Sequence, residues 1–286
     1  MYSVHEKIAN IIIEKLRKGI VPWREKWTSS WPPRNLISKK PYRGINLLLL
    51  SGLKYELPYF LTFKQVKYLK GSVIKGEKAH FAVSFRKTKS NAQSRVNFEL
   101  QFYHVFNISQ CKGIASKHIP WQINGGFNPI TEAKHITSNM PNPPKINFSS
   151  HKPCYIPDKD RINMPQINSF KSEEELYATL FHEMIHSTGH CSRLGRKSIN
   201  RIAAFASNVF TWEELVAELG TAFLCGEAGI SNLAGNNSSE YIQGWISRIM
   251  NDKTMIVFAA NAAQKACDYI LNRKKMETDN GWRTII

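Results

Sequence analysis

Two histidines four residues apart, with a glutamate directly after the first, are the residues whose types and spacing point most directly to chemistry. They occur in the segment His182-Glu183-Met184-Ile185-His186. On an α-helix, side chains at positions i and i+4 leave the same face about one turn apart, so both imidazoles can bind one metal ion. A glutamate beside such a pair can take a proton from a metal-bound water and pass it to a leaving amine. The segment therefore predicts a zinc-dependent hydrolytic site of the HExxH type, with Glu183 as the general base.

The residues around the motif predict that it lies on a helix. Ser172 and Glu175 have the spacing of a capping box, with Ser172 as the N-cap. Apolar residues then continue at helical spacing as far as Ile185, and Gly189 can adopt the left-handed backbone conformation that ends many helices. We therefore expect a helix that begins just after Ser172, carries the motif and ends near Gly189.

A catalytic zinc ion needs three protein ligands and one open position, so a third ligand must come from elsewhere. The metzincin pattern would place a histidine at residue 192, but that residue is Ser192. His190 lies four residues after His186, yet it follows Gly189, which we expect to end the helix and turn His190 away from the shared face. We therefore expect His190 to have a catalytic role, holding a substrate oxygen, and regard it as the less favoured candidate for a ligand.

The segment 211–219 offers glutamates from a second helix. Thr211 and Glu214 form another capping-box pattern, which gives Glu214 a structural role at the start of that helix. Glu218 lies one turn further on among apolar neighbours, where a carboxylate is costly unless it is paired or coordinated. The predicted zinc ligands are therefore His182, His186 and Glu218. Glu214 remains the alternative third ligand, or an acceptor for a ligand imidazole.

Hydrolysis also needs a group that stabilises negative charge on the reacting carbonyl oxygen. The sequence offers His190 and Tyr241 as candidates for this role. Two alternatives to a peptidase stay open: the metal could be purely structural, or it could serve a nuclease. The nuclease is the weaker alternative because the site is poor in the carboxylates that magnesium favours.

The net charge of +17 is distributed unevenly along the chain. The first 120 residues contain 22 lysines and arginines against 6 acids, whereas the remaining residues contain 17 against 16. A strongly basic segment favours a polyanionic partner, of which nucleic acid is the commonest. We therefore expect nucleic acid to bind the N-terminal part, with a basic but merely soluble domain as the alternative.

Hydrophobic periodicity predicts an α+β fold with two domains. In the first part, helical spacing occurs at 4–16, 46–53 and 62–70, and strand-like alternation occurs at 79–85 and 95–107. In the second part we expect a helix at 131–139, short strands at 145–148, 153–156 and 161–164, and then mainly helices. Glycines and a proline in 121–129 are typical of a linker. The predicted domains are 1–120 and 130–286, joined by the linker 121–129.

The five cysteines are odd in number, widely scattered and without a CxxC pair, which fits a reducing compartment best. The N-terminus has no apolar core of the length found in signal peptides. The longest nearly apolar run, 45–50, is far too short to span a bilayer. We therefore expect a cytoplasmic protein with no membrane partner.

Several segments resemble a known family. The segments 160–165, 177–190, 192–194 and 214–219 resemble the zincin-like metallopeptidase domain of ArdC-type antirestriction proteins. The segments 22–23, 40–46, 61–65 and 73–78 are similar to the single-stranded-DNA-binding domain that this family shares with plasmid conjugation primases. This resemblance, which covers nearly the whole chain, implies a protein of a plasmid, phage or other mobile element that binds single-stranded DNA and protects incoming DNA from restriction. A protein bound to DNA would be the peptidase substrate.

Single-strand binding without sequence reading needs cations for phosphates and aromatic faces for bases. The residues of the family-like segments that we predict to contact DNA are Trp23, Arg34, Lys40, Tyr42, Arg43, Lys64, Lys75 and Lys78, with Trp27 and Phe63 beside them. Arg43 and Lys75 each adjoin a glycine that allows a close backbone approach to phosphate. Each aromatic taken singly is better explained as a core residue. The competing hypothesis is a non-catalytic protein that coats single-stranded DNA, with a structural or vestigial metal site.

Overall fold

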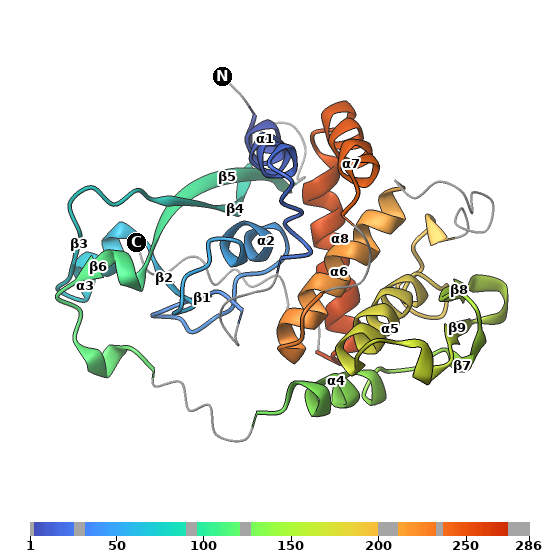
Figure 1. Cartoon of the computed structure of the whole chain (residues 1–286). Coiled ribbons are helices and arrows are strands. Elements are labelled where there is room, and N and C mark those ends of the chain that lie inside the picture. The colour runs from blue at the N-terminus through green and yellow to red at the C-terminus, as the bar shows by residue number, and fades with distance from the viewer. Residues whose placement is uncertain are drawn as a thin grey trace.

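The computed structural model describes residues 3–25, 32–89, 96–120, 127–199, 211–232 and 237–273. Figure 1 shows helices lying against a long two-stranded ribbon in the N-terminal half, and a mainly helical C-terminal half. Here the N-terminal half means the described residues up to 120, and the C-terminal half those from 127 onward. The fold is α+β, with helices and mixed sheets, as the sequence predicted.

The N-terminal half is built around an antiparallel ribbon of β4 (His80–Lys89) and β5 (Val96–Asn107), which confirms the two predicted strands. The ribbon belongs to a four-stranded sheet of order β1-β2-β5-β4, where β1 is Arg34–Asn35 and β2 is Tyr59–Leu61. Two further strands, β3 (Ser72–Val73) and β6 (Cys111–Lys112), form a separate antiparallel pair.

The three predicted N-terminal helices are α1 (Val4–Arg17), α2 (Ile45–Ser51) and α3 (Phe63–Tyr68). Both α1 and α3 begin with a complete capping box, which satisfies backbone N–H groups that the first helical turn leaves unpaired. Asn46 of α2 accepts a hydrogen bond from the backbone N–H of Val83 and donates one to its carbonyl, each over 2.7 Å. That side chain therefore caps the outer edge of the ribbon.

The C-terminal half contains α4 (Pro129–Ser138), α5 (Glu173–Ser187), α6 (Trp212–Ala228), α7 (Ser239–Asn251) and α8 (Met255–Ile270). Its strands are β7 (Lys145–Ser150), β8 (Cys154–Ile156) and β9 (Arg161–Pro165), in the order β7-β9-β8. β9 runs parallel to β7 and antiparallel to β8. One-turn 3₁₀ helices occur at Ile108–Gln110, Ser116–His118, Pro157–Lys159 and Ile167–Ser169. Of the predicted linker, residues 121–126 lie outside the described residues, and α4 already begins at Pro129.

The helix with the motif histidines begins at Glu173 as expected, because the Ser172 hydroxyl accepts a hydrogen bond from the Glu175 N–H over 3.1 Å. Its end differs from the expectation. Thr188 is the C-cap, in a right-handed conformation, and Gly189 is not among the glycines with positive φ. Gly189 instead lies where space is tight, since a Cβ there would lie 3.0 Å from Cβ of Ile199 and 3.1 Å from the His186 carbonyl oxygen.

The helices α5 and α6 approach closely at a glycine. A Cβ added to Gly220 of α6 would lie 2.6 Å from Cδ1 of Ile185 on α5, nearer than packed carbon atoms come. The absence of a side chain at Gly220 lets the two helices lie together, and both carry residues of the candidate site.

One hydrophobic core runs through both halves of the chain. It joins Ile12 of α1 and Leu48 of α2 to Trp245 of α7 and Ile256 of α8, all nearly or fully buried. Figure 1 shows α1 lying beside α7, and α2 beside the α6–α8 layer. Within the part of the chain that the structure describes, no helix is long and apolar enough to cross a bilayer.

Candidate metal centre

The two motif histidines converge on the buried side of α5. Their Nε2 atoms lie 3.2 Å apart, and the ring planes meet at 78°. His186 is 4% exposed, whereas His182 is half-buried and keeps access to solvent. The i and i+4 spacing thus produces the convergent pair that the sequence predicted.

Glu214 of α6 completes the cluster. Its Oε2 lies 3.4 Å from Nε2 of His182 and its Oε1 lies 3.4 Å from Nε2 of His186. The ligand atoms of these three side chains all lie within 4.8 Å of one another. Thr211 accepts a hydrogen bond from the Glu214 N–H, but the return bond of a capping box is not formed. The Glu214 carboxylate is therefore available to the imidazoles.

From the sequence we predicted Glu218, rather than Glu214, as the third ligand. That prediction disagrees with this geometry. Glu218 forms an ion pair with Arg24, with 2.6 Å between Nη2 and Oε1, and accepts a hydrogen bond from the Tyr241 hydroxyl over 2.8 Å. The physical premise was sound, since a carboxylate among apolar neighbours does require a partner. The partner is an arginine 194 residues away in sequence, which no local pattern could reveal.

The residues of the cluster fit a divalent metal ion. Two imidazole nitrogens and a carboxylate oxygen that point into one small space are the donors of many catalytic zinc sites, and imidazole and carboxylate also suit other divalent metals. Two facing Nε2 atoms 3.2 Å apart can share at most one proton between them, whereas a cation can accept a lone pair from each.

A second glutamate supports His186 from its other side. Glu213, 1% exposed, places Oε1 3.7 Å from Nδ1 of His186, so consecutive glutamates face the two nitrogens of one ring. Within the described part of the chain, Nδ1 has no hydrogen-bond partner within 3.5 Å, and 3.7 Å is too long for a hydrogen bond. Glu213 is itself held by Arg196, whose Nη2 donates over 2.5 Å, and by Ser198, whose hydroxyl donates over 2.5 Å.

The local charges favour the protonated form of His186 and the ionised form of Glu214 in this cluster. Burial by itself lowers the pKa of His186, but the charge of Glu214 and the nearby Glu213 outweigh burial and raise that pKa to about 10. Burial likewise raises the pKa of Glu214, but His186 and His182 outweigh it and the pKa falls below its usual value. The same negative charges that stabilise imidazolium favour a bound cation.

Glu183, the predicted base, is 6% exposed and lies on the same helix. Its carboxylate has no hydrogen-bond or ion-pair partner among the described residues, in contrast to Glu213 and Glu218. Glu183 is therefore a largely buried residue whose carboxylate no described side chain holds in place, as is typical of a group kept for chemistry.

The two candidates for oxyanion stabilisation have different surroundings. His190 is half-buried, and its Nδ1 lies 2.8 Å from the Ser192 hydroxyl, so it stands outside the three-residue cluster as the sequence suggested. Tyr241 is 9% exposed and its hydroxyl joins Trp23 and Glu218, with 3.1 Å to the indole nitrogen. Tyr241 therefore lies where the two halves of the chain pack against each other, a contact region called the seam below. The suggestion that Tyr241 faces the reacting carbonyl does not agree with this position.

Three of the residues predicted to contact DNA have other partners. Trp23 is fully buried, and its ring meets that of Trp245 edge-on at 5.9 Å. Tyr42, 5% exposed, packs edge-on against Phe60. Arg43 forms an ion pair with Asp268 of α8. Trp23 and Tyr42 are too buried to contact nucleic acid, whereas Arg43 is paired with Asp268 and keeps part of its side chain exposed.

The other predicted cations lie at the surface. Arg34 is half-buried, and the exposed residues are Lys40, Lys64, Lys75 and Lys78. Trp27 lies outside the described residues. Phe63 is 51% exposed, which distinguishes it from the buried aromatics of the same set.

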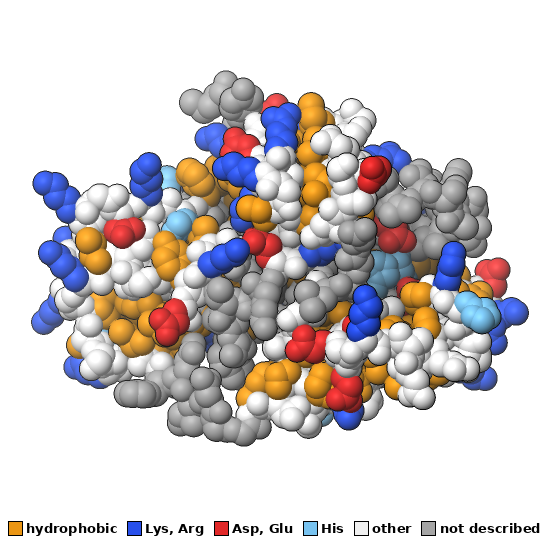
Figure 2. Space-filling view, viewed as in Figure 1, with side chains coloured by type: hydrophobic (Ala, Val, Ile, Leu, Met, Phe, Trp, Pro, Cys, Tyr) orange, Lys and Arg blue, Asp and Glu red, His pale blue; other side chains and the backbone are white. Residues whose placement is uncertain are grey.

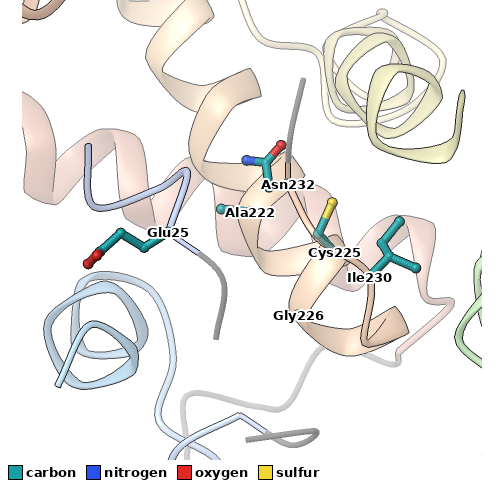
Figure 3. Close-up of a pocket in the computed structure, with 6 residues that line it drawn as sticks. All are labelled: Glu25, Ala222, Cys225, Gly226, Ile230 and Asn232. Carbon is teal, nitrogen blue, oxygen red and sulfur yellow. The ribbon is translucent and has the colours of Figure 1, made fainter. Parts of the chain in front are cut away.

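A small pocket lies along the second half of α6, more than two turns from Glu214 (Figure 3). Ala222, Cys225 and Gly226 of α6 line it together with Asn232, whose side chain donates to the Trp23 carbonyl over 2.7 Å. Glu25 closes the side toward the N-terminal half and pairs with Lys54. The pocket is a gap in the seam and contains none of the cluster residues.

Comparison with known proteins agrees with this division of the chain. Residues 2–108 match the family model described as the N-terminal domain of the anti-restriction factor ArdC, and residues 136–262 match that of a zincin-like metallopeptidase. The Mn(II)-bound crystal structure of the antirestriction protein ArdC from plasmid R388 is 31% identical, with a TM-score of 0.76 over 95% of this chain and 98% of that chain. Its metal-free structure gives a TM-score of 0.74 over 94% and 97%.

Two curated relatives extend the comparison. The DNA primase TraC of Escherichia coli is 30% identical over 93% of this chain, which spans only 27% of the primase. The uncharacterized protein y4eC of Sinorhizobium fredii is 26% identical, over 94% of this chain and 91% of that protein. The fold and the site together define a two-domain protein with a zincin-like C-terminal domain. The chain belongs to the ArdC family of antirestriction proteins, as the resemblance of its motifs implied.

Proposed function

We propose that this antirestriction protein binds single-stranded DNA through its N-terminal half and cleaves a DNA-bound protein at a zinc site in its C-terminal half. The observation that carries the proposal is the convergence of His182, His186 and Glu214, with their ligand atoms within 4.8 Å, beside the carboxylate of Glu183, which has no partner among the residues that the structure describes. The proposal places the protein in the cytoplasm, where incoming DNA is encountered.

The metal ligands in this proposal are His182, His186 and Glu214. When bound, the ion supplies Lewis acidity that polarises a peptide carbonyl and lowers the pKa of water. Glu183 holds the proton taken from the attacking water and returns it to the leaving amine, a role that its lack of a fixed partner supports. Glu213 and Arg196 hold the His186 ring in orientation from its Nδ1 side. His190, four residues beyond His186, holds a substrate oxygen.

Binding of single-stranded DNA is supported by the charge of the N-terminal half and by its family. The excess of bases over acids lies almost wholly in the first 120 residues. The likeness to a protein named as a DNA primase extends over the same region. Affinity should therefore fall steeply with salt concentration, because each lysine that neutralises a phosphate releases a counterion.

Replacing Glu183 by Gln tests the enzymatic part. Because Glu183 is not among the proposed ligands, we expect E183Q to retain one metal ion per chain by elemental analysis and full single-strand affinity, while protection of DNA from restriction is lost. E173Q, at an exposed position on the same helix, is the matched control. Full protection by E183Q would instead support a non-catalytic protein that occludes DNA.

A further inference from the structure

We propose that single-stranded DNA binds at the outer tip of the N-terminal half, where Phe63 and Tyr68 of α3 stack on its bases. The tip comprises α3 with the β3–β6 pair and the turns that follow these strands, residues 63–78 and 111–118. This inference rests on the proposed DNA binding and gives it a location and a mode; of the predicted contact residues, Lys64, Lys75 and Lys78 lie in this tip.

The exposed face of α3 is made only of aromatic and cationic side chains. Phe63 and Tyr68 are 51% and 73% exposed, and Lys64 and Lys67 lie exposed between them. Residues three and four apart share a helix face, so these four side chains form one surface. The opposite face anchors the helix, because Val66 is fully buried.

The two aromatics are held ready for stacking rather than used in the core. Nζ of Lys67 lies over one face of the Phe63 ring, 5.6 Å from its centre, and the 51% exposure of Phe63 leaves other ring surface open to solvent. The capping box of Thr62 and Gln65 fixes the start of this short helix, and the Asn35 side chain donates to Gln65 over 2.8 Å. The helix that carries Phe63 and Tyr68 is therefore held to the sheet beneath it.

The charge of the tip selects a polyanion. Figure 2 shows Lys and Arg side chains spread over the end of the molecule where α3, β3 and β6 lie in Figure 1. The exposed lysines of the tip are Lys64, Lys67, Lys70, Lys75, Lys78, Lys112 and Lys117. Glu77 is the one acid in the same two segments, and it accepts a hydrogen bond from the Gln110 side chain over 2.8 Å.

The combination of lysines with open aromatic rings favours a single strand over a duplex. Lysines alone would bind either, because both carry phosphates. Stacking on a side chain requires an unpaired base, and a paired base has its faces covered by its neighbours. Trp23 and Tyr42, the aromatic residues predicted from the sequence to contact DNA, are buried and cannot stack on its bases.

The test uses the full-length protein and three fluorescent probes of equal length: oligo-dT, the same backbone with abasic sites, and a duplex. For the F63A/Y68A variant we expect affinity for oligo-dT to fall at least about tenfold, given the strength of base–aromatic stacking. Affinity for the abasic strand should stay within about twofold, because its phosphates still meet the lysines. The conservative variant F63Y/Y68F should bind oligo-dT as the unmodified protein does.

Two control variants separate stacking from charge and from position. K64Q/K67Q should weaken binding of the oligo-dT and abasic strands alike and flatten the salt dependence by a slope of roughly 1.4, about 0.7 for each phosphate contact. F85A removes an aromatic that is 59% exposed on β4, outside the tip, and should change nothing. Thermal unfolding checks that every variant is folded.

The outcomes are distinguishable. If the unmodified protein does not bind oligo-dT, the proposed DNA binding itself fails. If it binds and F63A/Y68A binds equally well, or if F85A is the variant that loses affinity, the single strand lies elsewhere and only this inference is overturned. Equal loss of oligo-dT, abasic and duplex binding in F63A/Y68A would also overturn it, because such a surface attracts polyanions without stacking.

Discussion

Arg24 donates two hydrogen bonds to Glu218, from Nη2 to Oε1 over 2.6 Å and from Nε to Oε2 over 3.3 Å. The guanidinium also lies 4.0 Å from the centre of the Tyr241 ring. This pair joins the segment after α1 to the helix that carries Glu214, one turn from the candidate metal centre. The N-terminal half thus supports the position of α6 through a buried ion pair.

Replacing Arg24 by Ala should destabilise the protein strongly. The side chains of Arg24 and Glu218 are only 8% and 12% exposed, so the variant leaves a buried carboxylate without its cation, which costs about 3–5 kcal/mol. Chemical denaturation measures this loss. R273A breaks the more exposed pair with Glu227 and should cost about 1 kcal/mol or less. Equal effects of the two variants would contradict a clamping role for Arg24.

Replacing Glu214 by Gln should reduce zinc affinity by more than about 100-fold, beyond the loss expected when only a supporting hydrogen bond is removed. E218Q should retain zinc affinity, because its carboxylate faces Arg24 rather than the imidazoles. Competition with a coloured chelator gives both affinities. The reverse order would restore Glu218 as the ligand.

Changing Arg196 to Met should weaken zinc binding by roughly 10- to 100-fold without changing the stoichiometry. Arg196 holds Glu213, which in turn faces Nδ1 of His186, so the variant loosens a ligand without removing it. R196K keeps the charge and should recover part of the affinity. Unchanged zinc affinity in R196M would show that the Glu213 carboxylate does not orient the imidazole.

Replacing Gly220 by Ala should cost about 1–3 kcal/mol, because the new methyl group would overlap Cδ1 of Ile185 and push α6 away from α5. Zinc affinity should fall with it, since the two helices carry different ligands. The I185V substitution removes Cδ1, the nearest atom, but leaves Cγ1 2.8 Å from the new methyl group, so G220A/I185V should recover part of the stability and affinity lost in G220A. Thermal unfolding with and without zinc measures both effects.

The sequence alone determined the features that depend on neighbouring residues. The His182 and His186 spacing, the N-cap at Ser172 and the alternation along β4 and β5 each follow from the geometry of one helix or strand. The structure bears out these elements within a few residues at their ends. The excess of basic over acidic residues in the first 120 residues likewise follows from residue counts alone.

Tertiary structure decided the features that depend on residues far apart in the chain. Glu214 and Glu218 lie one turn apart, and their local patterns favoured Glu218 as the ligand; the approach of α5 to Glu214 and of Arg24 to Glu218 decides between them. Trp23 and Phe63 are both aromatic residues in family-like segments, yet one is fully buried and the other half exposed. Burial and ion pairing depend on which surfaces the folded chain brings together, and the local pattern of residues does not reveal those surfaces.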